Sequence, residues 1–141
     1  MTIYADSSFI VSLYLTDQHS HQARRQVSEA PTLWLTPLQK AEWAHAIAQN
    51  VFRRALDLVA AQQVYGQLEQ DRTLGLWIEN GIPDKAFELC ADLGRKYGPS
   101  LNVCTLDSLH VACALELKAE RFWTFDERQA KLAKAVGLNV T

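Results

Sequence analysis

Short apolar runs alternate along this chain with longer stretches that are typical of helices. The strand-like runs cover residues 2–5, 32–35, 73–79, 121–125 and 138–140, and the helix-like stretches cover residues 7–15, 21–29, 37–54, 56–71, 84–97, 105–119 and 127–136. Strands that alternate with helices form parallel sheets, with the helices packed against the faces of the sheet. The alternation therefore predicts an α/β fold in which helices cover both faces of a parallel sheet.

Proline and capping residues mark the ends of several of these elements. Thr36 suits the N-cap of a helix, and Pro37 suits the first helical turn that follows it. The helix expected over residues 84–97 should stop before Pro99, because proline disfavours continuation of a helix. No linker, repeat or low-complexity stretch interrupts the chain, so residues 1–141 are expected to form a single domain.

Composition narrows the class of protein. With 48% hydrophobic residues, 21% charged residues and a net charge of −2, the chain resembles a soluble globular protein that has no general attraction to nucleic acid. Cys90, Cys104 and Cys113 are an odd number of cysteines without a Cys-x-x-Cys pair, which fits a reducing compartment. With neither a leader-like start nor a membrane-length apolar run, the expected location is the cytoplasm, away from membranes.

Four acidic residues stand where an α/β fold collects its functional groups. Asp6 and Asp126 each follow a strand-like run, whereas Glu42 and Asp107 lie in helix-like stretches. Groups just past the carboxyl ends of parallel strands share one crevice. Crowded carboxylates repel one another unless a cation neutralises them, and oxygen-only sites suit hard divalent metals. The pattern indicates a metal-dependent phosphodiesterase.

Each acid also has a structural explanation. Asp6 and Asp126 suit helix N-caps, with Gln129 reaching back to the Asp126 cap, and Asp107 lies in a first helical turn that favours negative charge. Asp107 nevertheless lies on a helix face that should pack inward, where a carboxylate needs a partner. Glu42 is either a solvated residue at the edge of an apolar helix face or a group that bends into the crevice.

The residues around these acids resemble the PIN-domain family, and most closely its VapC-type toxins. The resemblance covers nearly the whole chain and is carried by Ala5-Asp6-Ser7-Ser8, Thr36-Pro37-Leu38 leading to Ala41-Glu42, Thr105-Leu106-Asp107-Ser108-Leu109-His110-Val111-Ala112, Thr124-Phe125-Asp126 leading to Gln129-Ala130, and Leu132-Ala133-x-Ala135-x-Gly137. Any one of these motifs is weak, whereas their order and spacing together are specific.

The resemblance implies a three-layer α/β/α domain with a central parallel sheet of about five strands. It implies an endoribonuclease that depends on Mg²⁺ or Mn²⁺ and acts as the toxin of a toxin–antitoxin pair. Its catalytic and metal-binding positions correspond to Asp6, Glu42, Asp107 and Asp126, and its supporting small polar positions to Ser8 and Thr124. An RNA substrate, a cognate antitoxin and homodimerisation are further implications.

We interpret Asp6 and Asp107 as the principal metal ligands. Glu42 would orient the attacking water or share the metal, and Asp126 would complete a second metal site or act through water. One metal and two metals both remain open. Many relatives carry an arginine where this chain has Cys104, which removes a basic group near the crevice without removing a ligand.

Other interpretations fit less well. A receiver-like phosphoacceptor domain would need an acidic pair after the first strand, but serines follow Asp6. A haloacid-dehalogenase-like phosphatase would need an acid in place of Ser8. Dinucleotide binding would need a glycine-rich first turn, but the first glycine of the chain is Gly66. The main alternative is a catalytically inactive PIN fold that binds RNA or protein. His110, one turn from Asp107, is expected to hydrogen-bond within the helix layer rather than ligate metal.

Overall fold

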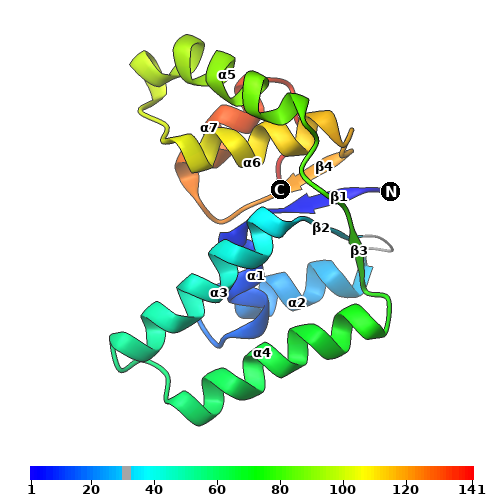
Figure 1. Cartoon of the computed structure of the whole chain (residues 1–141), viewed down its shortest axis with the longest axis vertical. Helices are drawn as coiled ribbons and strands as arrows, with labels where there is room; N and C mark the ends of the chain where they lie inside the picture. Colours follow the sequence, from blue (N-terminus) through cyan, green and yellow to red (C-terminus); the bar gives the residue numbers. More distant parts are fainter. Residues whose placement is uncertain (30–32) are drawn as a thin grey trace.

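A four-stranded parallel sheet lies at the centre of the computed structural model, which describes residues 1–29 and 33–141 (Figure 1). Its strands are β1 (Ile3–Ala5), β2 (Leu33–Leu35), β3 (Trp77–Glu79) and β4 (Arg121–Trp123), in the spatial order β3-β2-β1-β4. Strand β1 is interior and pairs in parallel with β2 and with β4. The predicted parallel α/β fold is confirmed.

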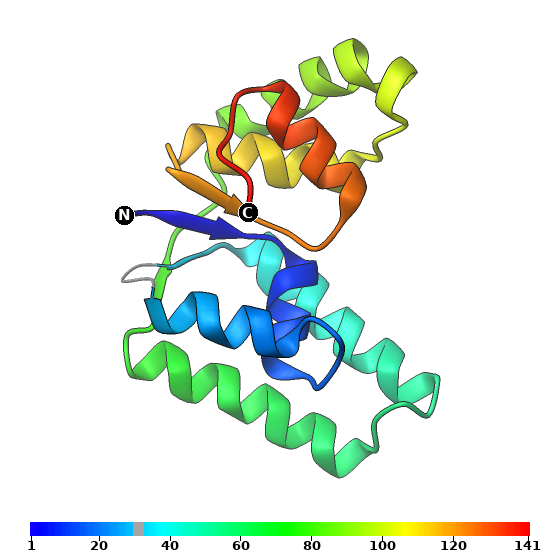
Figure 2. The same cartoon turned by 180° about the vertical axis from the view of Figure 1, so that it is seen from behind.

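Helices cover both faces of this sheet. They are α1 (Ser7–Tyr14), α2 (Ser20–Glu29), α3 (Pro37–Phe52), α4 (Leu58–Thr73), α5 (Lys85–Leu101), α6 (Thr105–Glu116) and α7 (Glu127–Ala135). Helices α1 to α4 lie on one face and α5 to α7 on the other, as the opposite views show (Figures 1 and 2). Ile3 and Ala5 join the core under α1 to α4, whereas Tyr4 joins the core under α5 to α7, because successive strand side chains point to opposite faces.

Several expected elements differ in extent from the sequence prediction, among them the run over residues 121–125, of which only Arg121–Trp123 forms a strand. The strand expected over residues 73–79 is only β3, because α4 continues to Thr73 and the chain reverses at Gly75, which has a positive φ of 81°. The strand expected over residues 138–140 is reduced to one isolated bridge between Val140 and Phe122. The strand expected over residues 32–35 begins outside the described residues.

Helix α5 passes through Pro99, so the stop predicted there is wrong. The helix ends at Leu101, and Asn102 caps it in the left-handed conformation with its N–H on the Gly98 carbonyl at 3.0 Å. Proline keeps a helical φ and only lacks its own N–H, and one further turn forms before the left-handed residue closes the helix. None of the helices that the structure describes combines the length and apolar character needed to cross a bilayer.

Gln39 joins the carboxyl ends of two strands to the start of α3. Its buried side-chain amide donates to the Ala5 carbonyl at 2.6 Å and to the Trp34 carbonyl at 3.1 Å. Its side-chain oxygen accepts from the Thr36 N–H at 2.6 Å and completes a capping box. The predicted N-cap at Thr36, with Pro37 in the first turn, is confirmed. The residues that follow β1 and β2 are therefore held at one edge of the sheet.

Tyr14 ties α1 to two elements on the same side of the sheet. Its hydroxyl donates to Asp71 at 2.6 Å and accepts from the Trp77 indole N–H at 3.0 Å. Burial and the hydrogen bond to Asp71 hold the pKa of Tyr14 far above its ordinary value, so the hydroxyl remains a donor.

Replacing Tyr14 with Phe should lower the free energy of unfolding by about 1–3 kcal/mol, because Asp71 and the buried Trp77 indole each lose a partner. Urea denaturation followed by tryptophan fluorescence measures the change. Tyr97→Phe is the matched control, since no hydrogen bond of the Tyr97 hydroxyl is found in the described part of the chain. Equal stability of the two variants would show that the Tyr14 hydroxyl contributes nothing specific.

Candidate active site

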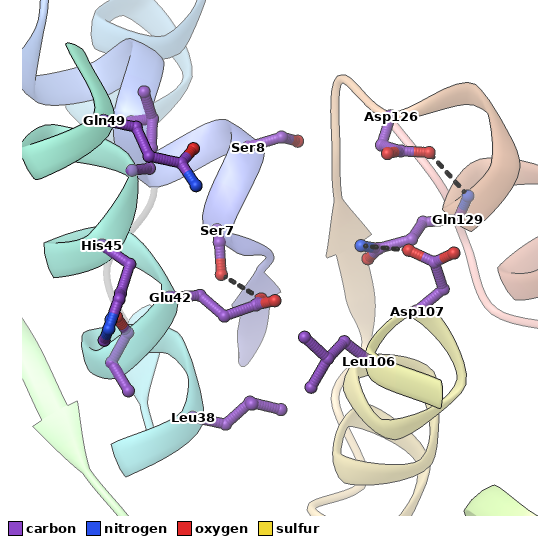
Figure 3. Close-up of a pocket in the computed structure, with 13 residues that line it drawn as sticks. Ser7, Ser8, Leu38, Glu42, His45, Gln49, Leu106, Asp107, Asp126 and Gln129 are labelled. Carbon is purple, nitrogen blue, oxygen red and sulfur yellow. Dashed lines mark hydrogen bonds between the residues drawn. The ribbon is translucent and has the colours of Figure 1, made fainter. Parts of the chain in front are cut away.

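A cavity of about 730 Å³ opens at the carboxyl edge of the sheet, between the two helical layers. One wall comes from α1 and α3 and carries Glu42, and the opposite wall comes from α6 and α7 and carries Asp107 and Asp126 (Figure 3). No lysine or arginine is among the described side chains that line the cavity. Three carboxylates therefore share a space in which histidines are the basic side chains nearby: His45 lines the cavity and His110 contacts Glu42.

Asp6 lies at the junction of β1 and α1 and has no solvent exposure. It caps α1 as predicted, because its carboxylate accepts from the Phe9 N–H at 3.0 Å. It also accepts from the Ser8 hydroxyl at 2.6 Å and from the Thr124 hydroxyl. Burial raises the pKa of Asp6, and these hydrogen bonds offset only part of that effect. Asp6 is not among the side chains that line the cavity, whereas the adjacent Ser8 is.

Ser8 and Thr124 join the end of β4 to the start of α1. The Ser8 hydroxyl accepts from the Phe125 N–H at 3.0 Å, and the Thr124 hydroxyl accepts from the Asp126 N–H at 2.9 Å. Both hydroxyls donate to the carboxylate of Asp6. The buried carboxylate therefore organises the backbone that leads to Asp126.

Glu42 reaches the cavity from α3 and is held through one of its two oxygens. Its Oε1 accepts from the Ser7 hydroxyl at 2.7 Å and contacts Nε2 of His110, which has no solvent exposure. Burial on its own would raise the pKa of Glu42, but the hydrogen bond and charge of His110 outweigh it and the pKa is lowered. The expectation that His110 hydrogen-bonds within its own helix layer is wrong, because its ring contacts Tyr4 on β1 and Glu42 on α3.

Asp107 is a buried residue in the first turn of α6. Its Oδ2 accepts from the backbone N–H of Cys104 at 3.1 Å and from the Cys104 thiol at 3.0 Å. Its Oδ1 accepts from the side-chain amide of Gln129 at 3.3 Å. The inward carboxylate that lacked a partner in the sequence is thus held by Cys104 and by a glutamine from α7.

Asp126 caps α7, as the sequence predicted. Its Oδ1 accepts from the N–H groups of Arg128 at 2.8 Å and Gln129 at 3.1 Å. The expectation that the Gln129 side chain reaches back to this cap is wrong, because that amide turns to Asp107 instead. Gln129 is therefore a site residue that sequence reasoning assigned to a purely local role.

The donor atoms at this edge fit a hard divalent cation. All the acidic groups offer oxygen, and neither Oε2 of Glu42 nor Oδ2 of Asp126 accepts a hydrogen bond from the residues that the structure describes. Within that same part of the chain, no three acidic, histidine or cysteine side chains are close enough together to enclose an ion. Mg²⁺ keeps several waters and needs few direct protein ligands, so carboxylates on facing walls are compatible with it.

The opposite pKa shifts of Asp6 and Glu42 predict opposite responses to neutralisation. The raised pKa of Asp6 means that its contribution to stability is present at pH below its ordinary pKa and is lost as pH rises through the raised value. At pH 7 in metal-free buffer, Asp6→Asn should not lower the free energy of unfolding, since asparagine still caps α1.

Glu42→Gln should instead lower that free energy by about 1–3 kcal/mol, because the hydrogen bonds from Ser7 and His110 favour the ionised group. This loss should be present above the ordinary pKa of glutamate and disappear as pH falls through the lowered value. Chemical denaturation between pH 3 and pH 7 measures both variants. A large loss of stability in Asp6→Asn at neutral pH would show that the charge itself holds the fold.

Known proteins share the arrangement of helices and strands described above. The sequence profile for PIN domains matches residues 3–135. No curated protein matches the sequence. Similar solved structures include VapC20 of Mycobacterium tuberculosis, described as a sarcin–ricin loop cleaving toxin, which has 16% identity, covers 96% of this chain and 95% of its own, and gives a TM-score of 0.72.

Two further structures show the same likeness. FitAcB of Neisseria gonorrhoeae has 16% identity, covers 98% of this chain and 95% of its own, and gives a TM-score of 0.73. VapBC2 of Rickettsia felis, bound to a DNA fragment from its promoter, has 13% identity, covers 100% of this chain and 98% of its own, and gives a TM-score of 0.71. At these identities the likeness establishes a shared fold.

Proposed function

Because this chain belongs to the PIN-domain family, we propose that it is a single-domain, metal-dependent endoribonuclease and the toxin of a toxin–antitoxin pair. The observation that carries the proposal is the cavity at the carboxyl edge of the sheet. It presents Glu42 on one wall and Asp107 and Asp126 on the other (Figure 3), and the buried Asp6 is hydrogen-bonded to Ser8, which lines the cavity. The donor set suits Mg²⁺ or Mn²⁺ and an RNA phosphodiester as substrate.

Each of the four acids has its own role in this proposal. Asp6 and Asp107 would be the principal residues for the ion: Asp107 would bind it from the cavity wall, and Asp6, with support from Ser8 and Thr124, would contribute its negative charge from the end of β1. Oε2 of Glu42, which faces away from the Ser7 hydrogen bond, orients the attacking water. Asp126 acts through water or at a second ion. A bound divalent cation supplies a Lewis acid that activates water and offsets charge on the phosphoryl oxygens.

A protein partner also fits the surface of the molecule. Phe52, Leu58 and Val59 are 88%, 63% and 66% exposed and lie on either side of the turn between α3 and α4. Leu74 and Ile78, near the edge strand β3, are 75% and 45% exposed. Exposed apolar side chains of this size are typical of protein contacts. We propose that these exposed side chains contact a cognate antitoxin and a second copy of the chain in a homodimer. The likeness to VapC20 and VapBC2 supports the toxin role.

The purified protein, freed of any antitoxin, should cut single-stranded or loop RNA in Mg²⁺ or Mn²⁺ and lose this activity in EDTA. Asp6→Asn and Asp107→Asn should be inactive, because each removes charge that the ion requires. Glu42→Gln should be strongly impaired, and Asp126→Asn should keep part of the activity if Asp126 acts through water. Cleavage of a labelled RNA measures all four variants.

Glu88→Gln is the matched control, because it removes one exposed carboxylate from α5 outside the cavity. It should cleave like the wild type. Equal cleavage by the wild type with and without EDTA would overturn metal-dependent catalysis. Absence of both RNA cleavage and Mn²⁺ binding would favour the alternative of an inactive PIN fold that binds RNA or protein.

The toxin role predicts that expression of the wild-type chain stops bacterial growth and that expression of Asp107→Asn does not. Co-expression of a small DNA-binding protein encoded by the neighbouring reading frame should restore growth and should elute with the chain in size-exclusion chromatography. Growth arrest by the Asp107→Asn protein at matched expression would show that toxicity does not come from this site.

A further inference from the structure

We propose that His110 and Tyr4 form a buried positioning pair that fixes which oxygen of Glu42 is free for chemistry. The hydrogen-bond arrangement is independent of the proposed function, and only its effect on catalysis rests on that function. His110 comes from α6 and Tyr4 from β1, so residues of two other elements set the orientation of one carboxylate on α3.

The histidine ring is held on both of its nitrogens. Nδ1 lies 2.9 Å from the Tyr4 hydroxyl, and Nε2 contacts Oε1 of Glu42. Tyr4 and His110 have no solvent exposure, and their ring centroids lie 5.9 Å apart in an edge arrangement. The Tyr4 ring in turn stacks on Phe122 at 5.6 Å, with an interplanar angle of 4°. The ring of His110 therefore has little freedom to rotate.

The chemistry of these partners decides where the ring carries its proton. An ionised carboxylate only accepts hydrogen bonds, so Nε2 must carry a hydrogen to bond to Glu42. In the neutral ring Nδ1 then accepts from the Tyr4 hydroxyl, whose pKa burial raises well above its ordinary value, so that it stays protonated. Glu42 thus selects the tautomer of His110 that carries its hydrogen on Nε2, and Tyr4 supplies the donor that the other ring nitrogen accepts.

The two oxygens of Glu42 therefore differ in their hydrogen bonding. Oε1 receives both the His110 donor and the Ser7 hydroxyl at 2.7 Å, whereas Oε2 accepts no hydrogen bond from the described residues. The side chain of Glu42 is 26% exposed, so the free oxygen borders the cavity. One oxygen is occupied by the protein, and the other keeps its lone pairs for water or for a cation.

Variants of His110 separate this positioning role from simple packing. The side-chain nitrogen of glutamine occupies the place of Nε2, whereas that of asparagine occupies the place of Nδ1 and falls short of Glu42. His110→Gln should therefore keep much of the activity, while His110→Asn and His110→Ala should lower kcat by roughly 10–100-fold with little change in KM. The same two variants should weaken Mn²⁺ binding in isothermal titration calorimetry, and Tyr4→Phe should cause a smaller loss.

Ser108→Ala is the matched control on the same helix. The Ser108 hydroxyl is buried and has no hydrogen-bond partner in the described part of the chain, so its removal should leave kcat and Mn²⁺ binding unchanged. Thermal unfolding of every variant identifies those that fail to fold. Wild-type kcat and Mn²⁺ affinity in a folded His110→Ala protein would overturn the positioning role.

A double-mutant cycle tests whether His110 acts through Glu42. In a Glu42→Gln background, His110→Ala should cause no further loss of kcat or Mn²⁺ affinity, because the residue that it positions is already altered. Independent, additive losses would show that His110 acts elsewhere and would overturn the proposal.

The tautomer provides a test that needs neither RNA nor metal. Nitrogen NMR of the histidine-labelled full chain in metal-free buffer should show a hydrogen on Nε2 of His110, assigned by comparison with His110→Gln. In Glu42→Ala this preference should weaken, because the acceptor is gone. A ring with a hydrogen on Nδ1 alone would overturn the arrangement. If the NMR result holds but no RNA is cleaved, the nuclease function fails while the Tyr4–His110–Glu42 contact stands.

Discussion

A carboxylate with no solvent exposure sits where the central strand of the sheet passes into its first helix. Asp6 accepts hydrogen bonds from the Phe9 N–H and from the hydroxyls of Ser8 and Thr124. A buried carboxylate is costly unless such donors surround it. The start of α1 and the end of β4 must therefore come together around Asp6. The Thr124 hydroxyl also accepts from the N–H of Asp126, the N-cap of α7, so it links Asp6 to the start of that helix.

Buried side chains connect the strands and the two helical layers at the carboxyl edge of the sheet. Gln39 ties β1 and β2 to the start of α3, and His110 joins α6 on the opposite face to Glu42 on that same helix. Each link crosses between elements through a buried side chain that has its hydrogen-bond partners. Partners of this kind make an arrangement rigid, since breaking one bond leaves a buried polar group unsatisfied.

Rigid walls explain how carboxylates can share a cavity whose described lining contains neither lysine nor arginine. Asp107 is held by Cys104 and Gln129, and Asp126 is held by backbone N–H groups at a helix N-terminus. These neutral donors fix the positions of the charges without cancelling them. Water, a cation or a phosphate with its counter-ions can then enter a site whose negative potential is preserved.

The sequence by itself determined the parallel α/β arrangement, the helix caps at Asp6, Thr36 and Asp126, and the gathering of Glu42, Asp107 and Asp126 at one edge of the sheet. These features depend on neighbours a few residues apart, or on the rule that strand ends share one edge. The helix stop predicted at Pro99 was wrong because proline tolerates a helical φ. The fifth strand expected over residues 138–140 is reduced to one bridge at Val140, because a strand forms only where a neighbouring strand pairs with it.

Only the tertiary structure decided how the acids are held. Glu42 and His110 are 68 residues apart in the chain, and Asp107 and Gln129 are 22 apart. No local pattern reports such a contact, because a side chain bonds to whatever partner the packed helices bring within about 3 Å. The burial of Asp6, the turn of Gln129 away from its own cap and the choice of one free oxygen on Glu42 all follow from packing across the sheet.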